Sequence, residues 1–94
     1  MHKELTIKRK KSLIGALISF PVLIDGKEIG LLKNNKSLTY SILPGKHTII
    51  FKAVEKDIKE EIDVSENIKS VEINTTTKMG LITATIKIES VKYR

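Results

Sequence analysis

Two turn signals, each placed between apolar runs that alternate with period two, constrain this chain most. The first is Asp25-Gly26 and the second is Pro44-Gly45. Asp-Gly between alternating runs predicts a two-residue hairpin, because both central residues of that turn need positive φ. Pro followed by Gly fits a type II turn, in which Gly takes the positive-φ position. We therefore interpret these four residues as structural turns and residues 20–54 as the core of an all-β fold.

The same alternation predicts strands on both sides of this core. The expected strands are residues 3–9, 18–24, 27–32, 37–43, 46–54, 58–64, 68–74 (continuing towards 77) and 81–91. Apolar residues on both faces of 46–54 favour a central position for that strand. Pro21 cannot donate to a ladder, so it indicates an edge strand, a strand start or a bulge.

Residues 58–64 fit two patterns. Ile58, Ile62 and Val64 alternate with charged residues, as in a half-buried strand. Val54, Ile58 and Ile62 are four apart, which is a helical spacing. A strand is preferred because its expected neighbours are strands, and one short helix at 55–64 remains the alternative.

Taken together, seven or eight short strands with turns near every tenth residue predict a small antiparallel β-sandwich, with an open barrel as the alternative. Ninety-four residues correspond to a single domain, 1–94. With 40% hydrophobic and 30% charged residues, the chain is too apolar for a disordered tail.

The residue types that carry most catalysis and metal binding are scarce. The chain has no cysteine, which excludes a disulfide framework, a thiolate zinc site and a cysteine nucleophile. No second ligand is spaced to join His47 in a metal site, so we interpret His47 as a structural residue that bonds a neighbouring loop through Asp25. No serine lies in a nucleophile elbow. The sequence predicts a non-catalytic module with no cofactor, metal or small-molecule substrate.

The densest charge is the tetrad Lys8, Arg9, Lys10 and Lys11, in a chain of net charge +6. One interpretation is the solvated end of a strand followed by an exposed loop. The other is an anion contact, in which the tetrad binds the phosphates of nucleic acid or an anionic membrane surface.

The last expected strand, 81–91, is the clearest alternation, with Ile82, Ala84, Ile86 and Ile88 inward. At a sheet edge, such a strand exposes unpaired backbone groups and recruits another strand. A protein partner, or a second copy in a homodimer, is then expected. Internal pairing of the strand is the alternative.

A basic start leads into an apolar run at 13–24, but Ser19 and Pro21 interrupt it and no small-residue cleavage pattern follows. The run is also shorter than the roughly 20 residues of a spanning helix. We expect a soluble domain with no signal peptide or transmembrane segment, and favour the cytoplasm.

Residues 22–30 (VLIDGKEIG) and 43–49 (LPGKHTI) resemble the paired turns of a PEGA-type module. The resemblance covers residues 22–54. It implies a small all-β domain of the kind often appended to bacterial proteins near the cell envelope. It also implies that the motif residues are structural and that the module is not a catalyst.

Overall fold

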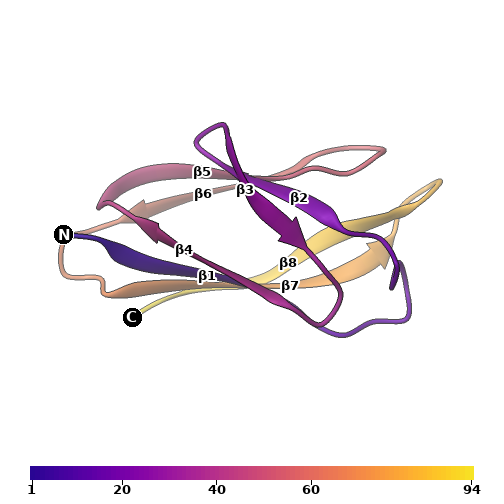
Figure 1. Cartoon of the computed structure of the whole chain (residues 1–94), viewed down its shortest axis with the longest axis horizontal. Helices are drawn as coiled ribbons and strands as arrows, with labels where there is room; N and C mark the ends of the chain where they lie inside the picture. The colour runs from indigo at the N-terminus through magenta and orange to yellow at the C-terminus, as the bar shows by residue number, and fades with distance from the viewer.

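The computed structural model describes all residues from 1 to 94 and contains eight β-strands and no helix (Figure 1). The strands are β1 (Lys3–Arg9), β2 (Phe20–Ile24), β3 (Lys27–Leu32), β4 (Ser37–Ile42), β5 (Gly45–Phe51), β6 (Ile58–Val64), β7 (Ser70–Met79) and β8 (Ala84–Tyr93). Every strand expected from the sequence is present, and β1, β3 and β6 have the expected bounds. No helical segment capable of crossing a lipid bilayer is present.

The strands form two four-stranded sheets, ordered β4-β1-β7-β8 and β3-β2-β5-β6. The predicted β-sandwich is confirmed. One pairing departs from the antiparallel expectation, since β1 and β7 run parallel, with Glu4 opposite Ser70 and Arg9 opposite Thr75. A parallel pair needs a long connection, and the five intervening strands supply it.

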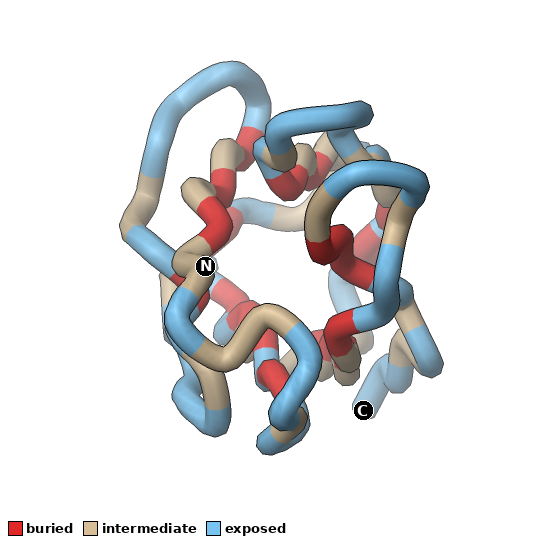
Figure 2. Tube along the Cα trace, turned by 90° about the vertical axis from the view of Figure 1, so that its right-hand side faces the viewer, coloured by how far each residue is buried: buried red, intermediate tan, exposed pale blue.

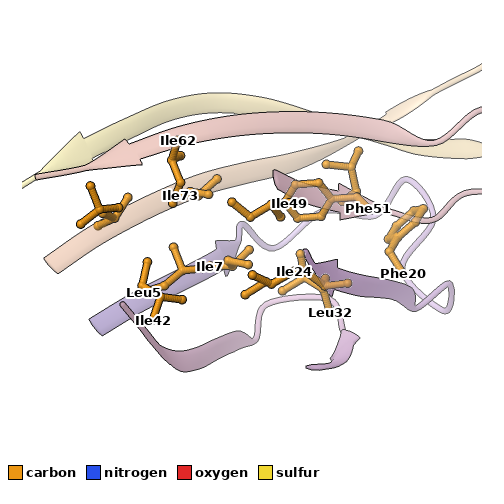
Figure 3. Close-up of a cluster of buried hydrophobic side chains, with 14 of the residues drawn as sticks. Leu5, Ile7, Phe20, Ile24, Leu32, Ile42, Ile49, Phe51, Ile62 and Ile73 are labelled. Atoms are coloured by element: carbon orange, nitrogen blue, oxygen red, sulfur yellow. The ribbon is translucent and has the colours of Figure 1, made fainter. Parts of the chain in front are cut away.

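Fifteen buried hydrophobic residues fill the space between the sheets. Figure 3 shows Phe20, Phe51 and several isoleucines converging from both layers. Figure 2, viewed along the sandwich, shows the buried positions surrounding the interior. On the strands that contribute more than one of them, they fall at alternate positions, such as Leu5 and Ile7 on β1. The period-two pattern therefore builds one packed core.

Backbone angles confirm the Asp25-Gly26 hairpin and the positive φ predicted at Gly45, which is the first residue of β5. Asp25 and Gly26 have φ of 50° and 86°, which are the two positive values that an Asp-Gly hairpin requires. Gly45 has a φ of 125°, and Asn35 has a φ of 57° in the turn between β3 and β4. These residues are therefore chosen for backbone angle.

The helix alternative at 55–64 is wrong. β6 pairs with β5 along its whole length, from Phe51 opposite Ile58 to Gly45 opposite Val64. Ile62 and Val64 reach the core while Lys59, Glu61 and Asp63 on the opposite face are exposed.

Two details of the strand predictions are also wrong. The strand expected at 46–54 ends at Phe51, and Val54 is 86% exposed in the following loop. Ile82, expected to point inward, precedes β8 and is 83% exposed.

Of the three alternatives for Pro21, the edge is excluded because β2 lies between β3 and β5. Pro21 lies at the start of β2, just before a register shift between Val22 and Leu23, as the other two alternatives predict.

Candidate functional site

The basic tetrad at the end of β1 is divided by the pleat of the strand. Lys8, Lys10 and Lys11 are exposed, whereas Arg9 is only 2% exposed. Lys8 lies on the outer face of its sheet, with its ammonium 3.1 Å from the carboxylate of Glu72. The tetrad is therefore not a single basic patch, and the expectation that all four residues are solvated is wrong for Arg9.

The Arg9 guanidinium binds the backbone of two neighbouring segments. Nη1 donates to the carbonyl oxygens of Ile18 at 2.6 Å and Leu32 at 2.9 Å. Nη2 donates to the carbonyl of Gly15 at 2.9 Å, and Nε donates to Thr77 Oγ1 at 3.0 Å. These donors are committed to internal acceptors, so Arg9 holds the loop between β1 and β2 against the sandwich.

Burial of Arg9 follows from its place in the strand. It shares the inward face of β1 with Leu5 and Ile7, and its guanidinium carbon lies 4.8 Å from the centroid of the Phe20 ring. Burial lowers the pKa of Arg9 from its ordinary value. The signal that identifies Arg9 as internal is the period-two spacing from Leu5, which the run of four basic residues obscures.

Three loops gather at one end of the sandwich, on the right of Figure 1. They are residues 10–19 between β1 and β2, residues 52–57 between β5 and β6, and residues 80–83 between β7 and β8. All three loops contribute to the lining of one small hollow, whose residues include Ser19, Val54 and Thr83. Both chain termini lie at the opposite end in the same view.

These loops carry most of the exposed apolar side chains of the protein. Of eleven large hydrophobic residues that are exposed, six lie in these loops and a seventh, Met79, ends β7 beside them; Leu17 and Leu81 are each 100% exposed. We call this set the apolar loop end, and its members are Leu13, Ile14, Leu17, Val54, Met79, Leu81 and Ile82. Single exposed leucines need no explanation, but such a concentration distinguishes this end of the molecule from the rest of its surface.

Polar contacts hold the second and third loops in place. The Glu55 carboxylate accepts hydrogen bonds from the backbone amides of Leu81, at 3.1 Å, and Ile82. Asp57 accepts from Lys52 Nζ at 2.9 Å and from the amide of Ala53 at 3.2 Å. The bond from Lys52, followed by the bond from that amide, lowers the pKa of Asp57. The apolar side chains therefore project from loops that are fixed by their backbone.

Lysines surround the apolar loop end. Lys10, Lys11, Lys56 and Lys78 lie in or beside the three loops, and none of them has an ion-pair partner. Glu55 lies among them, but its oxygens are taken by backbone amides. The surface thus combines projecting apolar side chains with unneutralised positive charge.

A hollow of about 770 Å³ opens between the second and third loops. Four hydrophobic residues and two of these lysines contribute to its wall. Its lining residues are Glu55, Lys56, Ile58, Lys78, Met79, Gly80, Leu81, Ile82 and Thr85. The surface of the apolar loop end is therefore not flat, because this hollow separates the second loop from the third.

At the other end of β2, the predicted contact of His47 is confirmed. His47 Nδ1 lies 2.6 Å from Asp25 Oδ2, and Nε2 lies 2.6 Å from the carbonyl oxygen of Leu43. A neutral imidazole donates from only one nitrogen, so both contacts are satisfied by the protonated ring. Burial lowers the pKa of His47, but the bonds to Asp25 and Leu43 outweigh it and leave the pKa above its ordinary value. The ring joins the two predicted turns.

No group of three or more His, Asp or Glu side chains in the chain could hold a metal ion. Comparison with protein-family models, with curated proteins and with solved structures gave no match for this chain.

Proposed function

We propose that this protein is a non-catalytic module that docks on an anionic lipid membrane through the apolar loop end. The observation that carries the proposal is the set of seven exposed apolar side chains, six on three fixed loops and Met79 at the end of β7, with unpaired lysines in and beside the same loops. The proposal develops the interpretation that the basic tetrad binds an anionic membrane. Of the tetrad, Lys10 and Lys11 contribute positive charge to this surface, and Arg9 does not because it is buried.

The two components match the two layers of a membrane surface. Burying an exposed leucine stabilises the bound state by about 1.5 to 3 kcal/mol, and Leu17 and Leu81 have their full side chains available. A lysine near an anionic leaflet adds about 1 kcal/mol. Stable attachment usually needs an apolar and a basic component together, and this end of the sandwich has both.

The proposed location follows from the charge of this surface. Anionic lipids are concentrated in the cytoplasmic leaflet, so we propose that the module lies at the cytoplasmic face of the membrane. We also propose that residues 22–54 form the paired turns of a PEGA-type module. That stretch lies mostly away from the apolar loop end and gives the scaffold that carries it.

Vesicle co-sedimentation tests the proposal. The wild-type protein should bind vesicles containing phosphatidylserine, bind phosphatidylcholine vesicles less, and bind more weakly at high salt. The double variant Leu17→Ser/Leu81→Ser should bind at least about tenfold more weakly, because two apolar side chains are lost.

Leu43→Ser is the matched control, since Leu43 is also exposed but lies in the turn before β5. It should bind like the wild type. Absence of wild-type binding at low salt, or equal losses in the double variant and the control, would overturn the proposal.

A second candidate function is self-association through β8. This strand pairs only with β7 and is an edge of its sheet, as the edge interpretation of the last strand requires. Lys87 and Lys92 lie on it, and a register shift occurs near Ser90, features that hinder promiscuous pairing. Size-exclusion chromatography with light scattering tests it, and a monomer at high concentration contradicts it.

A further inference from the structure

A polar groove lies on the sheet β4-β1-β7-β8, separate from the apolar loop end. Its volume is about 490 Å³, and none of its eleven lining residues is hydrophobic. They are Lys8, Arg9, Lys10, Asn35, Lys36, Ser37, Asn74, Thr75, Glu89, Ser90 and Lys92. The residues come from β1, β7, β8 and the turn into β4, so four segments distant in sequence build one depression.

Positive charge dominates the groove. Four lysines line it, against the single carboxylate of Glu89. Lys8 is paired with Glu72, but Lys10, Lys36 and Lys92 have no ion-pair partner. Three ammonium groups are therefore available to an anion.

Hydrogen-bonded polar side chains join β7 and β8 at the groove. The Glu72 side chain is 15% exposed and accepts a hydrogen bond from Asn74 Nδ2 at 2.9 Å. The same nitrogen lies 3.1 Å from Ser90 Oγ. The bond from Asn74, followed by that from Lys8, lowers the pKa of Glu72 and keeps it ionised. These hydrogen bonds hold the side chains of the groove in place without a ligand, so less conformational entropy is lost on binding.

We propose that this groove binds a small anion that carries two or more phosphate groups. Lysine ammonium groups act as point charges for phosphate, and the side chains of Asn35, Ser37 and Ser90 supply neutral donors for the remaining oxygens. No aromatic residue lines the groove, so the stacking platform that single-stranded nucleic acid uses is missing. The groove also lacks any apolar wall for a lipid chain, so the site recognises the phosphorylated group alone.

The groove does not depend on membrane docking, because Lys36 and Lys92 lie on a turn and a strand that carry none of the apolar side chains of the loop end. Lys10 alone is shared with the surroundings of that end. A free phosphorylated metabolite and a phosphorylated lipid headgroup present the same chemistry, and the experiment separates them.

Isothermal titration with inorganic tripolyphosphate at low salt tests the site. The wild type should bind, and Lys36→Gln/Lys92→Gln should bind at least about tenfold more weakly. The control Lys27→Gln/Lys46→Gln removes the same charge from exposed residues outside the groove and should bind like the wild type. Circular dichroism of both pairs verifies the fold.

Equal weakening in the two pairs, or no wild-type binding, would overturn the site. If the wild type binds a single-stranded oligonucleotide more tightly than tripolyphosphate, and the groove variant loses that binding, the proposed ligand class is wrong.

A second experiment distinguishes this site from the proposed membrane surface. Leu17→Ser/Leu81→Ser should keep its affinity for tripolyphosphate, so the two proposals can fail independently. If that variant still binds vesicles carrying phosphatidylinositol bisphosphate, the source is a headgroup; if it binds tripolyphosphate alone, the source is a free phosphate. Either result supports the site.

Discussion

The two ends of the sandwich use polar side chains differently. At the turn end, His47 bonds the Asp25 carboxylate and the Leu43 carbonyl, and Asp25 accepts from the Thr48 amide, so the two predicted turns are joined to each other. At the loop end, Arg9 and Glu55 bond loop backbone. The first arrangement closes an end of the fold. The second fixes loops whose apolar side chains remain in water, which is costly unless the surface has a partner.

The strongest way to break this contrast is to remove Arg9. Arg9→Met keeps much of the volume but leaves the carbonyls of Gly15, Ile18 and Leu32 without their buried donor. We expect a loss of about 3 to 5 kcal/mol in the free energy of unfolding, measured by urea denaturation. Arg9→Lys keeps the charge without the planar fork and should lose less. A loss below about 1 kcal/mol in Arg9→Met would contradict the conclusion that Arg9 holds the loop between β1 and β2 against the sandwich.

Glu55→Ala should have a smaller effect. It removes the acceptor of the Leu81 and Ile82 amides at an exposed position, so we expect a loss of about 1 kcal/mol in the free energy of unfolding. Hydrogen exchange at these two amides should accelerate, whereas exchange at the Asp25 amide, which bonds the Thr48 carbonyl, should not. Unchanged exchange at both amides would show that Glu55 does not fix the loop.

At the turn end, stability should depend on pH through two groups. The raised pKa of His47 means that its contribution is complete below its ordinary pKa of 6.5 and is lost as pH rises through the folded value. The bond from His47 lowers the pKa of Asp25, so that contribution is present above the ordinary pKa of 3.8 and is lost as pH falls. Unfolding followed against pH should show both losses in the wild type. His47→Gln should flatten the alkaline one, and an unaltered profile would contradict the pairing.

The smallest effect on stability is expected at the loop end itself. Val54→Ser replaces a side chain that is almost fully in water, so the free energy of unfolding should change by no more than about 0.5 kcal/mol. Val22→Ser, at a fully buried position of β2, is the contrast and should be strongly destabilising. A large loss in Val54→Ser would mean that the loop end belongs to the core.

Local sequence patterns predict most of the strands and turns. The features that they do not predict depend on contacts between residues that are distant in sequence. Period-two alternation locates β1, β3 and β6, and Asp25-Gly26 locates a hairpin, because these features depend on neighbouring residues. Nothing local specifies that β1 pairs in parallel with β7, since that pairing depends on which strands meet across the chain.

The candidate site was harder to predict for the same reason. In the sequence, Val54 and Ile82 continue the alternation of the neighbouring strands. In the structure, β5 ends at Phe51 and β8 begins at Ala84, so both residues lie in loops. Arg9 could have been recognised as internal from its spacing to Leu5 and Ile7, but its acceptors come from three other segments. A surface made of three loops becomes visible only when the fold brings them together.

Because the chain has no cysteine, a single cysteine can carry a polarity-sensitive fluorophore at a chosen position. Leu17→Cys and Leu81→Cys would report on the loop end, and Leu43→Cys on the turn end. If the loop end docks on membranes, adding phosphatidylserine vesicles should shift the emission of both loop-end labels to the blue and leave the Leu43→Cys label unchanged. Equal shifts at both ends, or no shift at the loop end under conditions where the protein binds vesicles, would contradict the account.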